Sequence, residues 1–129
     1  MHSSSMSSAL RQYRQVNTET GVATASPHRL IQMLFEGALE RLASAKGHLQ
    51  RNEVASKGEQ IGKAINIIGG LHESLNLEAG GELARNLNAL YDYMQRCLLQ
   101  ANLKSDPVLL DEVAGLLREL KAGWDAIGS

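Results

Sequence analysis

The chain has 129 residues, a length that suits one domain with a single hydrophobic core. Its 13 Lys and Arg residues nearly balance its 14 Asp and Glu residues, and it has no basic stripe with interleaved aromatics, so we expect no nucleic-acid surface. No apolar run reaches the ~20 residues of a membrane span, and no secretory signal is expected. The single cysteine, Cys97, leaves no internal disulfide and favours a reducing cytosol.

The first 25 residues precede the strong helical patterns. Residues 1–8 are small and polar, and we expect a disordered tail in which Met6 is a second candidate for the natural start. Residues 9–25 are expected to form an arm with one short helix, which is too short to be stable alone. The arm must therefore either pack on the rest of the protein or stay mobile. The apolar residues along this helix are Leu10, Tyr13 and Val16.

Two of the predicted helices carry explicit start signals. Ser26 precedes Pro27, and Asp106 precedes Pro107. An oxygen at the N-cap accepts a backbone N–H that has no partner in the helix, and proline is tolerated at the first helical position. The predicted helices run from Pro27 to about Leu49, from about Val54 to Leu75, from about Glu82 to Leu103, and from Pro107 to about Ile127.

Within each predicted helix, apolar residues recur at spacings of three and four, which is typical of one buried face. Gly80 and Gly81 break the pattern between the second and third helices. The short connections force neighbouring helices to run antiparallel. We therefore predict an all-α fold, an up-down-up-down four-helix bundle over residues 26–129. Trp124 should be mostly buried near the start of the first helix.

Two kinds of chemistry found in helical bundles lack their sequence signatures here. A di-metal site needs Glu-x-x-His on two helices, and no histidine of this chain has a glutamate three residues before it. A phosphotransfer bundle needs a histidine three residues before a Lys-Gly pair, and that spacing is also missing. The histidines are too scattered for zinc. We expect no enzyme, catalytic residue, metal or cofactor, and expect the histidines at the surface or at helix caps.

Several apolar residues lie off the predicted core faces. Residues two apart on a helix point about 200° apart, so only one of Tyr91 and Tyr93 faces the core. A small bundle exposes some apolar side chains in any case. Five or more of them on three helices favour a groove for another chain, which such a surface binds as an amphipathic helix. The apolar candidates are Met33, Leu39, Ile67, Tyr91, Tyr93, Leu99 and Leu103.

Two amides lie within otherwise apolar helical patterns, at Asn66 and Asn86. A carboxamide offers both a donor and an acceptor, so these residues suit the backbone of an extended bound chain. They are equally compatible with ordinary solvated asparagines. We keep both interpretations open.

Six segments together resemble the family of the flagellar secretion chaperone FliS: LRQYRQV, TASPHRLIQMLFEGA, KAINIIGGL, GGELARNLNALYDYM, LLQANLKSD and EVAGLLRELKAGW. They extend from Leu10 to Trp124 in the family's order. The resemblance implies a bacterial, cytoplasmic, non-enzymatic chaperone. Such a protein binds the disordered C-terminal segment of flagellin, prevents premature polymerisation and delivers its client to the flagellar type III export gate.

The resemblance also implies partners and roles for the arm. The partners are flagellin, the export gate protein FlhA and, in some bacteria, the regulator FliW. Leu10 and Tyr13 match family positions for docking to FlhA. We expect the arm, with Val16, to cover part of the flagellin groove near the first and third helices until the client displaces it. The alternatives are a structural bundle that self-associates through the same apolar surface and a signalling bundle, which the missing Lys-Gly pair disfavours.

Overall fold

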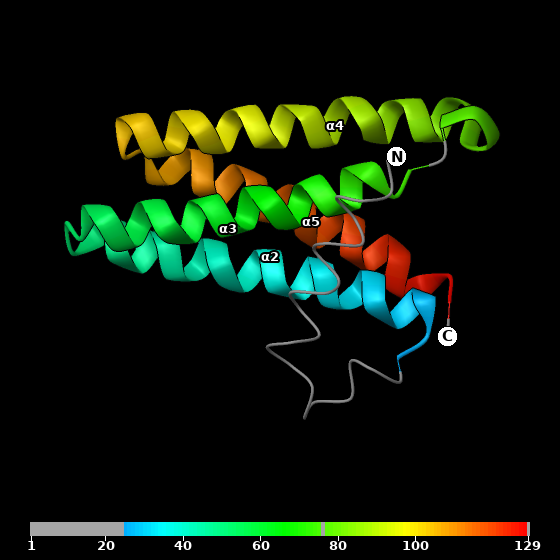
Figure 1. Ribbon diagram of the computed structural model, residues 1–129, viewed down its shortest axis with the longest axis horizontal. Coiled ribbons are helices and arrows are strands. Elements are labelled where there is room, and N and C mark those ends of the chain that lie inside the picture. The colour runs from blue at the N-terminus through cyan, green and yellow to red at the C-terminus, as the bar shows by residue number, and fades with distance from the viewer. Residues whose placement is uncertain (1–24, 76, 129) are drawn as a thin grey trace.

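A computed structural model describes residues 25–75 and 77–128, which form four α-helices and contain no strand. The helices are α2 (Pro27–Gln50), α3 (Val54–Glu73), α4 (Leu77–Lys104) and α5 (Pro107–Ala126). Consecutive helices run in opposite directions (Figure 1). This confirms the predicted all-α four-helix fold. The predicted tail, residues 1–8, and the arm up to residue 24 lie outside the described residues.

The helix ends follow the predicted capping residues. The backbone N–H of Arg29 donates to Ser26 Oγ at 3.1 Å, and that of Val108 donates to Asp106 Oδ1 at 3.0 Å. Each bond satisfies a first-turn donor that has no partner within its own helix. The two proline starts are therefore confirmed.

The predicted break between the second and third helices is a kink inside α4. Gly81 has φ 61° and ψ −140°, a combination that only glycine adopts without strain. A Cβ on Gly80 would collide with the Cβ of Ala84. Helical structure nevertheless begins before the kink, at Leu77, so the expected start at Glu82 is too late.

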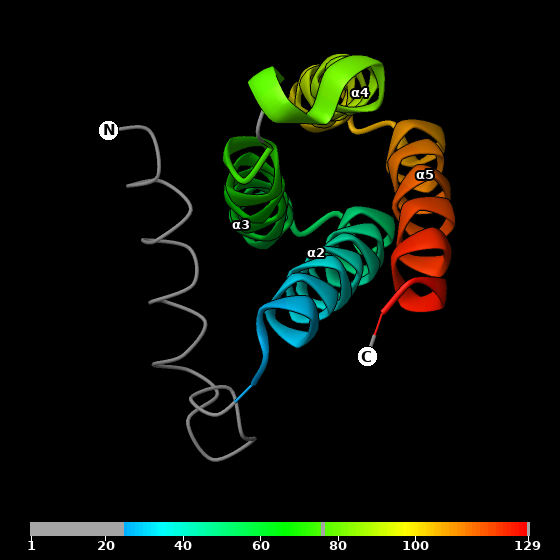
Figure 2. The ribbon, with the colours of Figure 1, turned by 90° about the vertical axis from the view of Figure 1, so that its right-hand side faces the viewer.

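The four helices form a ring around one core. Seen end on, α2 lies beside α3 and α5, and α4 completes the ring between them (Figure 2). Every helix contributes side chains that are fully enclosed, and Cys97 is buried among them. The largest of these side chains are Leu34 and Leu42 of α2, Ile61, Ile68 and Leu71 of α3, Met94 and Leu98 of α4, and Leu110, Val113 and Leu117 of α5.

The spacing of three and four that predicts the buried faces also includes Leu83 and Ile127, and both residues are exposed. Leu83 has the helical phase of the buried face of α4. His72, in the last turn of α3, contacts Asn88, and the two helices are antiparallel, so α3 ends before it reaches Leu83. Ile127 caps α5 and lies beyond its last helical residue. Helix length, which periodicity does not report, explains both differences.

One buried charged side chain, Lys57 of α3, forms hydrogen bonds to the C-terminal end of α4. Lys57 is the only charged side chain that is buried in the described part of the chain. Its Nζ donates to the backbone oxygen of Asn102 at 3.0 Å and to Ser105 Oγ at 2.7 Å. The ammonium thus satisfies a carbonyl at the C-terminus of α4, where the helix dipole also favours a cation.

None of the described helices is long and apolar enough to cross a membrane.

Adjacent leucines on α4 test this assignment of the core. Leu98 is 0% exposed and Leu99 is 55% exposed. Leu98→Ala should lower the free energy of unfolding by about 2–5 kcal/mol, because it removes buried methyl groups and leaves a cavity. Leu99→Ala should change it by less than about 1 kcal/mol. Urea denaturation followed by circular dichroism measures both, and equal losses would contradict the assignment.

Candidate functional site

The candidate surface residues differ widely in exposure. Leu103 is 78% exposed, and Leu99, Tyr93, Asn66 and Asn86 are exposed as well. Leu39 and Ile67 are partly buried against the core. Tyr91 is only 5% exposed, which confirms that one tyrosine of the pair faces inward.

Met33 lies outside the main core, as the sequence pattern predicts, but little of its side chain is exposed. It is 7% exposed and forms a small cluster with Leu30, separate from the main core. Ala25, just before the N-cap, packs against this cluster. The burial of Met33 therefore belongs to a separate cluster at the start of α2 and not to the main core.

Hydrogen bonds between carboxamides and α3 define the α3–α4 seam. His72 of α3 lies with Nε2 2.6 Å from Asn88 Oδ1 and Nδ1 3.2 Å from Gln95 Oε1. Gln95 Nε2 also donates to the backbone oxygen of Ile65 at 3.5 Å. Leu99 follows Gln95 by one turn and therefore lies at the outer edge of this seam. Leu103 continues the same edge.

The α4–α5 seam holds Tyr93 in a polar cluster. Its hydroxyl donates to the carboxylate of Glu112, and the Arg96 guanidinium lies 5.9 Å from the centre of its ring. The hydrogen bond to Glu112 raises the pKa of Tyr93, since ionisation would place two negative charges side by side. Asn86 lies two turns before Tyr93, on the same side of α4. Tyr93 is thus exposed but already engaged.

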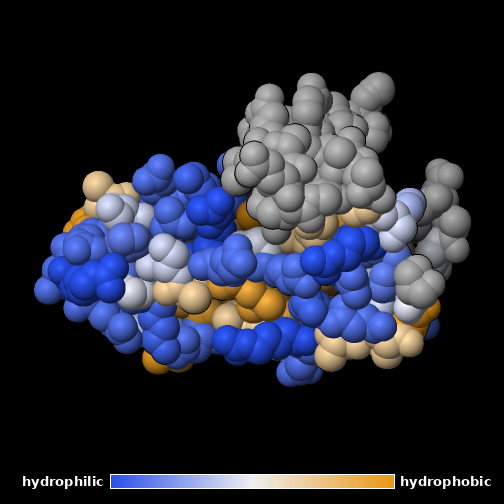
Figure 3. Space-filling view, turned by 90° about the horizontal axis from the view of Figure 1, so that it is seen from below, coloured by the Kyte–Doolittle hydropathy of each residue, from blue (hydrophilic) through white to orange (hydrophobic). Residues whose placement is uncertain are grey.

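Ion pairs bracket Leu39 on the α2–α5 seam. Lys46 lies 2.9 Å from Asp111, and Lys121 lies 3.9 Å from Glu36. Leu39 is one turn beyond Glu36 and faces the gap between these two bridges. Figure 3 views the molecule from the side on which α2 lies, and it shows a hydrophobic band between two rows of hydrophilic side chains.

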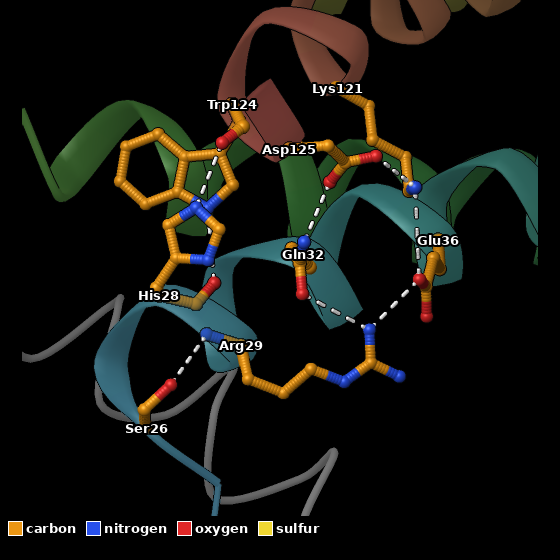
Figure 4. Close-up of polar contacts among 8 residues, drawn as sticks. All are labelled: Ser26, His28, Arg29, Gln32, Glu36, Lys121, Trp124 and Asp125. Atoms are coloured by element: carbon orange, nitrogen blue, oxygen red, sulfur yellow. Dashed lines mark hydrogen bonds and ion pairs between the residues drawn. The ribbon is translucent and has the colours of Figure 1, made fainter. Parts of the chain in front are cut away.

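A reciprocal contact joins the start of α2 to the end of α5 (Figure 4). Trp124 Nε1 donates to the backbone oxygen of His28 at 3.0 Å, and His28 Nε2 donates to the backbone oxygen of Trp124 at 2.8 Å. The rings stack with centroids 4.7 Å apart and planes 10° apart. Trp124 lies near the start of the first helix as predicted, although it is only partly buried.

Charged side chains reinforce this joint. Gln32 Nε2 donates to Asp125 Oδ1 at 2.7 Å, and Lys121 Nζ lies 2.7 Å from Asp125 Oδ2. The hydrogen bond from Lys121, followed by that from Gln32, lowers the pKa of Asp125. Sequence reasoning missed the cross-helix roles of His28 and His72, because spacing alone does not show which helix ends meet.

Among the residues that the structure describes, no three His, Cys, Asp or Glu side chains gather as a metal site. The exposed candidates placed above are distributed over the α3–α4 and α4–α5 seams, Leu39 lies on the α2–α5 seam, and Tyr91 and Met33 are buried.

Comparisons with known proteins agree with the resemblance. A family model described as "Flagellar protein FliS" matches residues 9–129. The chain is 56% identical over 119 residues to the flagellar secretion chaperone FliSB of Pseudomonas aeruginosa, covering 92% of this chain and 94% of the relative. It is 50% identical to the flagellar secretion chaperone FliS of Salmonella typhimurium, covering 93% and 90%. For FliS of Vibrio cholerae the identity is 43%, covering 95% and 90%.

Alkaline unfolding tests the burial of Tyr91. Burial raises the pKa of Tyr91 to about 12, whereas an unfolded tyrosine titrates near pH 10. The folded state therefore resists ionisation, and the stability that this provides is complete below about pH 10 and is lost as the pH rises toward 12. Between about pH 9 and 11.5, Tyr91→Phe should lose less stability than the parent, measured by urea midpoints. Identical losses would show that Tyr91 does not titrate with unfolding.

Proposed function

The chain belongs to the family of flagellar protein FliS, and from this premise we propose that it is a cytoplasmic export chaperone for flagellin. It binds the disordered C-terminal segment of flagellin, prevents premature polymerisation and delivers the client to the flagellar type III export gate. The family is non-enzymatic. The family match over residues 9–129 is the observation that carries this proposal.

The distribution of exposed apolar side chains supports a client that wraps around the bundle. A disordered segment loses conformational entropy when it binds, so it needs a large contact area in compensation. At ~25 cal/mol per Å², burying roughly 1,500 Å² of apolar area gives a gross gain of tens of kcal/mol, most of which ordering and association offset. Separate contacts on several seams provide such an area without a deep pocket.

We assign the exposed candidates to direct client contact and the others to its support. The exposed group contains Leu99, Leu103 and Tyr93, with Asn66 and Asn86. Leu39 and Ile67 contribute their exposed edges. Met33 and Tyr91 lie beneath the surface and shape it from inside.

A binding assay with a fluorescent flagellin C-terminal peptide tests the function. Leu99→Ser combined with Leu103→Ser should weaken binding at least about tenfold, because two exposed apolar contacts are lost. Ile127→Ser serves as the matched control, since Ile127 is exposed at the opposite end of the bundle. No binding by the parent at tens of micromolar, together with a stable dimer, would instead favour the self-associating structural bundle.

The arm connects client binding to delivery in this proposal. Residues 9–25 lie over part of the client surface near α2 and α4 in the free protein, through Leu10, Tyr13 and Val16. Flagellin displaces the arm, and Leu10 and Tyr13 then dock on FlhA. Such a lid must be weakly held, by a few kcal/mol, because the client competes with it. FliW is a further partner that acts on the same flagellin pathway.

Leu10→Ala combined with Tyr13→Ala tests the arm. The double variant should weaken binding of the loaded chaperone to FlhA, because both docking side chains are removed. Its melting temperature should stay within about 2 °C of the parent, because the proposed lid is only weakly held. Its flagellin affinity should be unchanged or slightly higher. Surface plasmon resonance on immobilised FlhA measures the effect, and equal gate affinity would remove these residues from the role.

A further inference from the structure

Three carboxamides repeat along the side of α4 that faces α3. Asn88, Gln95 and Asn102 are spaced seven residues apart, so they form one row, which we call the carboxamide row. Asn88 and Gln95 meet His72, and Gln95 also reaches the backbone of Ile65. The Asn102 carboxamide lies beside Gly58, 3.7 Å from where a Cβ would stand. All three side chains are partly exposed, and solvent therefore reaches the row.

The spacing of the row matches an extended peptide. Seven residues of α-helix rise about 10.5 Å, and three residues of extended chain cover about 10 Å. A polyproline II chain also presents the same side every third residue, and its peptide groups have no internal hydrogen bonds. A carboxamide has two acceptor lone pairs and two donor hydrogens, so Asn88 and Gln95 keep free positions beside their contacts with His72 and Ile65, and each amide can pair with a polar group of a backbone. The full row thus spans about seven residues of an extended partner.

Apolar side chains accompany the row on its outer side. Leu99 lies between Gln95 and Asn102, and Leu103 follows directly. Both are largely exposed, so they can take the apolar side chains of a chain whose backbone rests on the amides. There is open space on the α3 side of the seam, because a Cβ added to Gly62 of α3 would have no neighbouring side chain within 4 Å.

We propose that the carboxamide row binds the backbone of an extended stretch of the client, about seven residues long, while Leu99 and Leu103 hold its apolar side chains. This proposal rests on the proposed function and specifies which seam receives the extended part of the client. The carboxamide row contacts only the backbone of the client and not its side chains. The client stretch therefore tolerates sequence changes that keep it extended and apolar on one side.

Near-isosteric substitutions in the full chain test the row. Gln95→Met and Asn102→Leu keep the side-chain size and remove the polar ends. Each should weaken binding of the flagellin C-terminal peptide about 5- to 10-fold, the effect of one hydrogen bond. Gln100→Met is the matched control, since Gln100 is an exposed amide on the same helix away from α3. It should stay within about twofold of the parent.

A change in the client's backbone distinguishes direct binding by the carboxamide row from a role of the row in holding α3 and α4 together. Peptides that carry an ester in place of one backbone amide, moved along the sequence, lose one N–H donor at a time. An ester that weakens binding to the parent should have no further effect on Asn102→Leu or Gln95→Met, because the partner amide is already absent. Asn102→Leu is the safer variant, because its side chain makes no hydrogen bond among the described residues that the substitution would break.

The outcomes are distinct. Weakened binding with non-additive esters supports the proposal. Variants that bind like Gln100→Met overturn it and leave the chaperone function standing, because the parent still binds. Weakened binding with fully additive esters also overturns it, since the row then only positions the helices. A parent that fails to bind the peptide overturns the proposed function and this inference together.

Discussion

The single core that runs along the axis of the bundle is the constraint on which the rest of the structure depends. Each helix buries one apolar stripe, and within residues 25–75 and 77–128 it buries that stripe against its neighbouring helices. Fully enclosed side chains such as Leu34, Ile68, Leu98 and Val113 come one from each helix, so no helix can leave without opening the core. Everything off the stripe therefore lies at a seam or in solvent.

The seams around this core differ in chemistry, and that difference matters for binding. The α2–α5 seam is bridged by ion pairs such as Lys46 with Asp111, while the α3–α4 seam carries carboxamides around His72. Exposed ion pairs contribute little to stability and are screened by salt. Amides keep their hydrogen-bonding capacity without charge. This uncharged hydrogen-bonding capacity is the reason why we propose the α3–α4 seam for the extended part of the client.

The helix ends are fixed by polar contacts that reach across the bundle. His28 and Trp124 exchange side-chain-to-backbone hydrogen bonds, and Lys57 caps the C-terminus of α4 from α3. These contacts satisfy backbone groups that a helix terminus leaves without partners. The N-cap of α2 at Ser26 lies two residues before the His28–Trp124 joint.

The sequence by itself determined the helices and their order, because periodicity and capping are local properties. Ser26 and Asp106 marked their helix starts correctly, and the segments quoted for the FliS family identified the relatives. Only the tertiary structure decided which apolar residues are exposed: Met33 is buried in a separate cluster with Leu30, and Leu83 is uncovered because α3 ends early. The apolar periodicity of one helix does not show at which residue the neighbouring helix ends. Contacts between residues far apart in the chain, such as His28 with Trp124, follow from that packing and leave no signal in local spacing.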